Sequence, residues 1–288
     1  NSFRSKKHAK YAFKTKLIMF DKNTFNNKIA LVTGGRSGIG FQIAKDLLQL
    51  GATVIIASRK EEPLKKAADE LGEFGTIYHH PCDIRKTEEI QDLVKVIQEK
   101  CGRLDILINN AGGQFPALTE YINDKGWNAV INNNLNGTFF MIREMGNAFF
   151  IPQKNGIIVN IIADILRGFP GMIHTGAARA GVENITKTIA QEWSDFNIRI
   201  NCVAPGIVES TGLDTYPKPV QDMFEDAKKA IPMHRFGTVK DVSNAVCFFA
   251  SDLSAYCTGT TLYVDGAQHL NYDKMGLARV MRDFLNPQ

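Results

Sequence analysis

From residue 28 onward, the sequence alternates short β-branched runs with longer segments whose apolar residues recur every three to four positions. This alternation is typical of βαβ units, in which helices connect the strands of a parallel sheet. The expected strands are 29–33, 53–57, 76–80, 104–109, 156–161, 199–203 and 261–264. The expected helices begin near Gly38, Glu61, Thr87, Asp124, Gly171 and Val239. The pattern predicts one α/β domain with a Rossmann-type, doubly wound sheet of about seven parallel strands.

Two segments do not follow this pattern, a basic one at the start of the chain and an irregular one after the sixth expected strand. Residues 1–18 contain six basic side chains and no acidic one, and we expect residues 1–27 to form a flexible basic leader, with a targeting signal as the alternative. The domain then covers residues 28–288. Within it, residues 206–237 are the longest irregular stretch, and they follow the sixth expected strand. Open α/β folds bind ligands at that edge of the sheet, so we predict that this stretch is a lid.

Composition argues against several classes of function. Without the six leader cations, 28 basic residues stand against 30 acidic ones, a balance that gives no reason to expect a nucleic-acid surface. The five cysteines are odd in number and contain no C-x-x-C pair, so neither a disulfide framework nor a metal site is indicated. No apolar run reaches the roughly 18 residues of a membrane span. We expect a reducing compartment, the cytoplasm or an organelle lumen, and the ending 285–288 lacks the peroxisomal S-K-L address.

A glycine-rich segment joins the first expected strand to the first expected helix. Glycines let the backbone turn sharply and approach a pyrophosphate, while a helix N-terminus offers free N–H donors to an anion. A tight turn with no ligand is the alternative interpretation. The residues that we expect to contact a dinucleotide here are Gly34, Arg36, Ser37, Gly38, Ile39 and Gly40.

The end of the second expected strand indicates which dinucleotide binds. An NAD enzyme commonly carries an acidic residue there to hold the ribose hydroxyls. This chain has Ser58, Arg59 and Lys60 instead. Arg59 and Arg36 could clamp a 2′-phosphate through charge-assisted hydrogen bonds, the alternative being that both are solvated surface residues. We therefore predict NADPH as the cofactor.

Several motifs between residues 28 and 266 resemble those of the short-chain dehydrogenase/reductase family. They are the T-G-x-x-x-G-x-G loop at 33–40, N-N-A-G at 109–112, N-L-N-G-T at 134–138, N-C-V-A-P-G at 201–206 and V-D-G at 264–266. The resemblance implies further cofactor contacts at Asp83, Ile84, Asn110, Ala111, Gly112, Pro205, Gly206 and Val208.

The same resemblance locates the catalytic positions, where the sequence departs from the family pattern. The family uses a Ser, a Tyr and a Lys together with an Asn. Here Asn134 matches the Asn, Thr175 the Tyr, Arg179 the Lys, and Ile162 the Ser. A threonine hydroxyl cannot be tuned to act as an acid near neutral pH, which disfavours alcohol–ketone interconversion. Thr175 and Arg179 share a helical face and can still donate hydrogen bonds, and Arg179 is also expected to hold the cofactor.

Within that family, four further segments resemble most closely the trans-2-enoyl-CoA reductases of peroxisomes, namely residues 56–60, 112–115, 125–127 and 174–182. The family's 2,4-dienoyl-CoA reductases use a Tyr eleven residues before Thr175, where this chain has Asp164. We therefore expect NADPH-dependent reduction of an enoyl thioester in fatty-acid metabolism, with the proton donor unassigned. Two alternatives stay open, a ketoreductase or alcohol dehydrogenase of the same family and a catalytically silent nucleotide-binding protein.

Two further expectations concern assembly and a neighbouring histidine. The resemblance implies a homotetramer built through the helices near 124–151 and 171–197, and Phe139, Phe140, Phe149 and Phe150 are expected to supply apolar surface for it. His174 is expected to make a local bond at the start of a helix, with a proton relay as the alternative.

Overall fold

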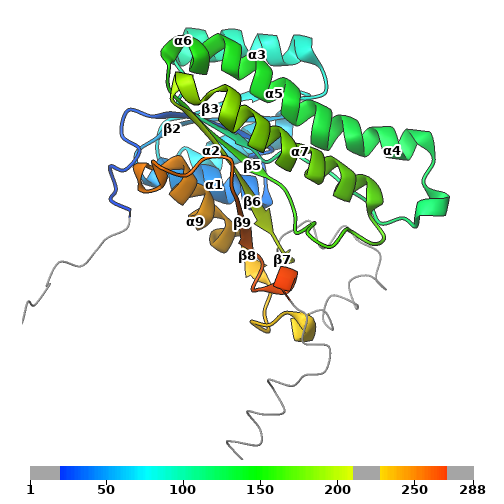
Figure 1. Ribbon diagram of the computed structural model, residues 1–288. Coiled ribbons are helices and arrows are strands. Elements are labelled where there is room, and N and C mark those ends of the chain that lie inside the picture. Colours follow the sequence, from blue (N-terminus) through cyan, green and yellow to red (C-terminus); the bar gives the residue numbers. More distant parts are fainter. Residues whose placement is uncertain (1–19, 210–227, 271–288) are drawn as a thin grey trace, which may run out of the picture.

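The computed structural model describes residues 20–209 and 228–270, and it contains the predicted parallel sheet (Figure 1). The strands lie in the order β3-β2-β1-β4-β5-β6-β9, and every pair of neighbours is parallel. The fold class expected from the sequence is therefore confirmed. The seven strands are β1 (Ile29–Thr33), β2 (Thr53–Ser58), β3 (Ile77–Pro81), β4 (Ile106–Asn109), β5 (Gly156–Ile161), β6 (Ile198–Pro205) and β9 (Thr261–Val264).

Helices cover both faces of the sheet, which explains why its central strands are mostly apolar on both sides. On one face lie α1 (Gly38–Gln49), α2 (Glu61–Leu71) and α9 (Val239–Ala250); on the other lie α3 (Thr87–Cys101), α5 (Gly137–Met145) and α7 (Ile173–Glu192). Side chains alternate between the two cores along each strand. Leu31 of β1, for example, packs against the α3 side, and its neighbour Val32 packs against the α1 side.

One long helical stretch runs from Asp124 to Gln153 and includes two π-helical turns. It consists of α4 (Asp124–Ile131), η2 (Asn132–Asn136), α5, η3 (Gly146–Phe150) and α6 (Ile151–Gln153). π-Helical turns occur frequently at functional sites, and the first of these two carries Asn134. Short 3-10 turns lie at η1 (Thr119–Tyr121), η4 (Ser194–Phe196), η6 (Asp252–Ser254) and η7 (Gln268–Leu270).

Element boundaries differ from the predictions by a few residues. Helix α7 begins at Ile173 rather than at Gly171, because Gly171 has a left-handed φ of 78° that a helix cannot contain. Strand β4 begins at Ile106 rather than at 104, and the Asp105 carboxylate just before it accepts a hydrogen bond from the Ile29 N–H at 2.8 Å. Strand β6 runs on to Pro205, which places its end beside that of β9.

The packed core begins before residue 28, where the sequence predicted the domain to start. Phe25 is buried in the core under α1, and its N–H donates to the Leu50 carbonyl at 2.9 Å. Residues 1–19 of the expected leader lie outside the described residues, as do residues 210–227 of the expected lid. The described ends of that lid are joined, because β7 (Val208–Glu209) pairs in parallel with β8 (Gly237–Thr238).

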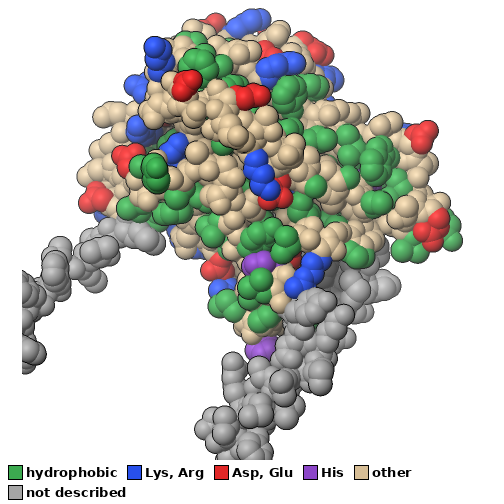
Figure 2. Space-filling model, viewed as in Figure 1, with side chains coloured by type: hydrophobic (Ala, Val, Ile, Leu, Met, Phe, Trp, Pro, Cys, Tyr) green, Lys and Arg blue, Asp and Glu red, His purple; other side chains and the backbone are tan. Residues whose placement is uncertain are grey.

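The surface is mixed in character. Phe139 is 38% exposed, but Phe149 and Phe150 are buried against the sheet, so the expectation that these two supply assembly surface is wrong. On the face shown in Figure 2, basic side chains are scattered among acidic ones rather than gathered in one patch. Within residues 20–209 and 228–270, no helix is both long and apolar enough to cross a membrane.

Candidate active site

The glycine loop between β1 and α1 is built for close backbone approach. Gly34 and Gly38 have φ values of 68° and 58°, which L side chains rarely adopt. A Cβ added at Gly40 would lie 2.5 Å from the Gly34 carbonyl oxygen, so only glycine fits there. Ser37 occupies the N-cap of α1, but its side chain makes no capping hydrogen bond. The first N–H groups of α1 therefore stay available to an anion, and the loop fits a pyrophosphate.

Thr33 and Asn110 hold this loop against the end of β4. The Thr33 hydroxyl accepts hydrogen bonds from the backbone N–H groups of Asn110 and Ala111, both at 3.0 Å. In return, the Asn110 side-chain amide donates to the Thr33 carbonyl at 3.0 Å and to the Gly34 carbonyl at 3.3 Å. Because these bonds link the carboxyl ends of β1 and β4, they fix the floor of the cavity that opens between them.

That cavity has a volume of about 510 Å³ and gathers most of the residues expected to contact the cofactor. The expected residues that line it are Gly34, Arg36, Ser37, Gly38, Ile39, Ser58, Arg59, Ile84, Asn110, Ala111 and Gly112. Three lining residues were not predicted, namely Ala57, Cys82 and Asn133. Each directly precedes a predicted residue in the sequence, which is the signal that could have found them. Burial raises the pKa of the Cys82 thiol to about 12, so this sulfur is not a reactive thiolate.

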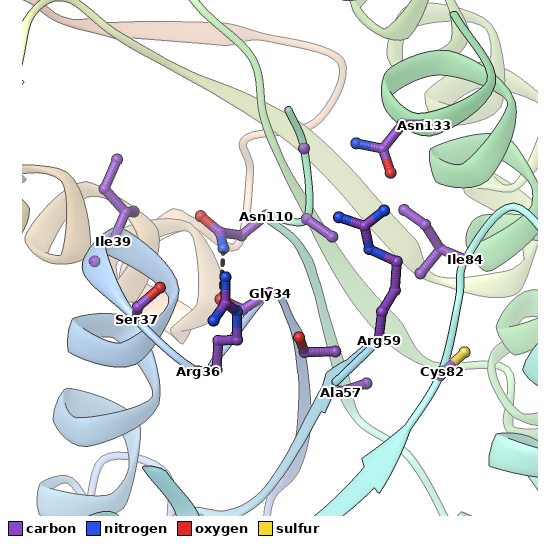
Figure 3. A pocket seen from close by; sticks show the side chains of 14 residues that line it. Gly34, Arg36, Ser37, Ile39, Ala57, Arg59, Cys82, Ile84, Asn110 and Asn133 are labelled. Atoms are coloured by element: carbon purple, nitrogen blue, oxygen red, sulfur yellow. Dashed lines mark hydrogen bonds between the residues drawn. The ribbon is translucent and has the colours of Figure 1, made fainter. Parts of the chain in front are cut away.

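Two arginines stand at the mouth of the cavity without an ionic partner. Arg36 comes from the loop after β1 and Arg59 from the end of β2, and Arg59 extends toward Asn133 (Figure 3). Both side chains are exposed, and neither forms an ion pair with any carboxylate in the described part of the chain. The cavity therefore presents two positive charges without an ion pair at the end of β2, where an NAD enzyme commonly carries an acidic residue.

The remaining expected cofactor residues lie outside the lining of this cavity. Lys60 is exposed and forms the N-cap of α2, while Asp83 accepts hydrogen bonds from Arg85. The Arg85 hydrogen bond keeps the pKa of the Asp83 carboxyl below its usual range. The others are Gly40, inside the turn of α1; Arg179, on α7; Pro205, at the end of β6; Gly206, packed against Asp265; and Val208, in β7.

Arg179 is a buried cation beside the cavity. Its Nη1 donates to the Ile161 carbonyl at 2.9 Å, and its Nη2 lies against Gly112, where an added Cβ would come within 2.4 Å. No carboxylate of residues 20–209 or 228–270 pairs with it. Burial lowers the pKa of Arg179 to about 10, so the side chain is still charged at neutral pH.

Thr175 and His174 are fully buried at the start of α7 and carry unused hydrogen-bonding atoms. The Thr175 hydroxyl and the His174 Nε2 have no hydrogen-bond partner. The His174 Nδ1 accepts from the Thr175 backbone N–H at 2.9 Å, which is the local bond expected for this histidine. Buried polar atoms without partners are uncommon in folded proteins, so these two require an explanation.

Asn134 acts through its side chain on the segment that follows β4. Its Oδ1 accepts from the Gly113 N–H and its Nδ2 donates to the Gly113 carbonyl, both at 2.9 Å. Its own carbonyl accepts from the Thr138 hydroxyl at 2.9 Å within the helical bend. Asn134 therefore holds Gly113, and with it the wall of the cavity next to Arg179, in a fixed position.

No tyrosine among the described residues lines this cavity, so no phenol is placed there to transfer a proton. Of the four described tyrosines, Tyr121 and Tyr256 are exposed. Burial, followed by the charges of Glu183 and Asp164, raises the pKa of Tyr263, which makes that phenol a weaker acid. The site can bind and polarise an oxygen through hydrogen-bond donors and a buried cation, but it lacks the tuned phenol that protonates a ketone oxygen.

Comparison with known proteins agrees with this architecture. A family model described as enoyl-(acyl carrier protein) reductase matches residues 34–269. A protein of Bacillus subtilis named "Probable 2,4-dienoyl-CoA reductase" is 35% identical over 253 residues, which cover 85% of this chain and 97% of that protein. The 3-oxoacyl-(acyl-carrier-protein) reductase of Thermotoga maritima is 37% identical over 241 residues, with coverages of 83% and 96%.

Solved structures give the same result. A short-chain dehydrogenase from Bacillus anthracis superposes with a TM-score of 0.81 at 38% identity, over 86% of this chain and 99% of that one. A citronellol catabolism dehydrogenase of Pseudomonas aeruginosa superposes with a TM-score of 0.78, also at 38% identity, over 87% and 98%. By sequence, by family model and by fold, the chain belongs to the short-chain dehydrogenase/reductase family of oxidoreductases.

Proposed function

We propose that this oxidoreductase uses NADPH to reduce the C=C bond of trans-2-enoyl thioesters in fatty-acid metabolism. One observation carries the proposal: at the position of the family's tyrosine, Thr175 presents a buried hydroxyl that has no partner in the protein. One helical turn later, Arg179 presents a buried charge. Neither residue lines the cavity, but Arg179 lies against Gly112, which does. A buried hydroxyl and a buried cation next to a cavity that no described tyrosine lines suit a reaction in which negative charge develops on an oxygen.

The choice of NADPH over NADH is supported by charge at the mouth of the cavity. Members of the family use a nicotinamide cofactor, and a 2′-phosphate is what distinguishes NADPH from NADH. Arg36 and Arg59 both line the cavity and are not neutralised by any described carboxylate. A guanidinium can bind a phosphate through two parallel hydrogen bonds, so these two residues would hold that phosphate.

In the proposed reaction, bound NADPH would supply a hydride to Cβ of the substrate, and a proton from water would complete Cα. Electron density then moves onto the thioester oxygen before Cα is protonated. The Thr175 hydroxyl donates a hydrogen bond to that oxygen, and Arg179 stabilises the charge while holding the cofactor. Asn134 fixes the Gly113 wall through its two hydrogen bonds and so positions both ligands. No acid has to protonate the oxygen itself.

Reduction of a 3-oxoacyl thioester is the second candidate, and one relative favours it. The Thermotoga maritima protein is named as a 3-oxoacyl reductase. Asp164 could supply the proton, since burial raises the pKa of its carboxyl. Its side chain is already occupied in part, because Oδ1 accepts from the Leu166 N–H at 3.4 Å.

Turnover of two substrates separates these candidates. Purified protein is mixed with NADPH and either crotonyl-CoA or acetoacetyl-CoA, and nicotinamide absorbance is followed. Because general-acid catalysis contributes roughly a hundredfold or more, the proposal predicts a kcat/KM at least that much larger for crotonyl-CoA. A preference for acetoacetyl-CoA would establish the second candidate. Binding of NADPH with turnover of neither substrate would indicate a silent nucleotide-binding protein.

We also infer that the protein assembles as a homotetramer through the α4–α5 and α7 helices. Trp127 and Phe139 support this, because they leave 37% and 38% of their large apolar surfaces exposed on α4 and α5. Two-fold symmetric pairing of these helices would cover both side chains. Light scattering at micromolar concentration tests the inference, which a monomeric mass would contradict.

A further inference from the structure

The His174 imidazole has one ring nitrogen engaged and the other buried without a partner. The ring is fully buried, and its Nδ1 accepts the Thr175 N–H at 2.9 Å, a hydrogen that also points to the Met172 carbonyl at 3.0 Å. An accepting Nδ1 carries no proton, so in the neutral ring the proton sits on Nε2. His174 therefore holds an N–H donor in the interior with no acceptor.

Phe115 and the segment around it place this donor next to the proposed substrate position. The Phe115 ring meets the imidazole edge-on, with centroids 4.6 Å apart and planes at 83°. Phe115 follows Gly112 and Gly113, which contact Arg179 and Asn134. The same segment is tied to the turn before α7, because the Ala117 N–H donates to the Gly171 carbonyl at 2.8 Å. The imidazole thus lies between α7 and the loop that forms one wall of the site.

The unpartnered atoms of this region are complementary to a carbonyl oxygen. In the described part of the chain, four buried side-chain atoms lack a hydrogen-bond partner, and two of them belong to the consecutive residues His174 and Thr175. A hydroxyl and a neutral imidazole N–H are both able to donate. Leaving two donors unpaired in the interior is costly, and an acceptor brought by a ligand would remove that cost.

We propose that His174 is a further catalytic residue, which donates its Nε2–H to the thioester carbonyl oxygen of the substrate alongside the Thr175 hydroxyl. The proposal rests on the enoyl-thioester function above and names a second donor for the same oxygen. Phe115, which is 39% exposed, covers the imidazole and must shift for the acyl thioester to reach it. No proton is transferred from the imidazole, which acts as a neutral hydrogen-bond donor.

A pair of substitutions separates this role from a purely structural one. His174→Asn places an amide oxygen near Nδ1, so it can keep the bond from the Thr175 N–H while losing the donor. His174→Gln places an amide N–H near Nε2 and loses the Nδ1 acceptor. If His174 only supports the start of α7, turnover should fall in the variant whose thermal midpoint falls. The Asn variant should then be both more stable and more active than the Gln variant. If His174 donates to the substrate, turnover should instead be better with Gln.

Three measurements are made on wild type and both variants: the thermal midpoint, kcat for crotonyl-CoA at saturating NADPH, and the Kd of butyryl-CoA with NADP⁺ bound. We expect His174→Asn to keep the thermal midpoint, to lower kcat by roughly a hundredfold and to weaken butyryl-CoA several-fold. His174→Gln should lower the thermal midpoint but retain kcat within about tenfold. An Asn variant with wild-type kcat, or losses that follow the midpoint in both variants, would overturn the assignment.

The binding measurement keeps this test separate from that of the proposed function. If wild type reduces no enoyl thioester, the function is wrong, and the butyryl-CoA Kd then decides the role of His174. Weaker binding by Asn but not by Gln would still support the donor. Equal binding by all three proteins, or no binding by wild type, would overturn it.

Discussion

The Arg179 guanidinium donates from Nη1 to the main-chain carbonyl of Ile161 at 2.9 Å, so a neutral acceptor holds a buried cation at the end of β5. No carboxylate of the described residues cancels the charge. Burying an unpaired ion opposes folding, and a side chain kept there at that cost is expected to serve the bound ligands. With a pKa of about 10, Arg179 is charged throughout the neutral range.

Replacing Arg179 should therefore separate stability from activity. Arg179→Met keeps much of the apolar stem and removes the buried charge, although it leaves the Ile161 carbonyl unpaired. We expect the free energy of unfolding, measured in urea, to stay within about 1 kcal/mol of wild type, since these two effects offset each other. Turnover should fall at least tenfold, and the NADPH concentration needed for half-maximal rate should rise. Lower stability with unchanged turnover would show that Arg179 is structural.

Cofactor preference can be tested at two adjacent residues. Arg59→Ala should weaken NADPH binding by roughly 1.5 to 3 kcal/mol, the scale of a hydrogen bond to a charged group, and leave NADH nearly unchanged. Lys60→Ala is the matched control, because Lys60 is the neighbouring exposed cation but does not line the cavity. Fluorescence titration of wild type and both variants with each cofactor gives the six dissociation constants. Equal losses for NADPH and NADH, or an equal effect of Lys60→Ala, would contradict the assignment of Arg59.

The start of α9 supplies a prediction about pH. Thr238 and Asp241 form a capping box, and Arg235 donates to the Asp241 carboxylate at 2.8 Å. The Arg235 hydrogen bond and the Thr238 backbone N–H together lower the pKa of Asp241 to about 2. A depressed carboxyl pKa contributes stability that is present above the unfolded value of about 3.9 and is lost as the pH falls toward 2.

Asp241→Asn should accordingly lower the free energy of unfolding by about 1 kcal/mol at pH 7, the usual scale of a helix cap. The difference from wild type should shrink between pH 4 and pH 2, because protonated Asp241 then resembles the asparagine. Urea unfolding at several pH values measures this. A difference that stays constant down to pH 2 would mean that the ionised carboxylate does not stabilise the cap.

The parts of this protein that the sequence predicts well are those set by local backbone chemistry. The seven strands follow from short β-branched runs, because both faces of the sheet are buried. The loop at Gly34, Gly38 and Gly40 was recognisable because only glycine tolerates its φ angles and close contacts. Residues that line the cavity largely follow these elements, since parallel strands bring their carboxyl ends to one edge.

The features that the sequence does not predict depend on contacts between residues far apart in the chain or on the orientation of side chains. The spacing of residues in the sequence does not determine either of these. The cofactor contact of Asp83 stays a prediction, but the hydrogen bond that its carboxylate accepts from Arg85 could not be predicted from spacing. Phe149 and Phe150 were expected on the surface, but the π-helical turn carries them into the core. The unpartnered His174 Nε2 likewise becomes visible only when every neighbour has been placed.

The central claim is that the Thr175 hydroxyl binds the substrate oxygen, and Thr175→Val tests it most directly. Valine keeps the shape and removes only the donor, while Thr175→Ser keeps the hydroxyl and serves as the control. Because Thr175 Oγ1 makes no hydrogen bond within the protein, the valine variant should fold at least as stably as wild type and bind NADPH equally well.

The decisive measurement is kcat/KM for crotonyl-CoA in Thr175→Val, Thr175→Ser and wild type. Loss of one donor to a developing oxyanion should raise the barrier by about 2.7 to 4 kcal/mol, a fall in rate of roughly a hundred- to a thousandfold, whereas the serine variant should stay within about tenfold of wild type. Unchanged crotonyl-CoA reduction in a folded, NADPH-binding Thr175→Val enzyme would contradict the account.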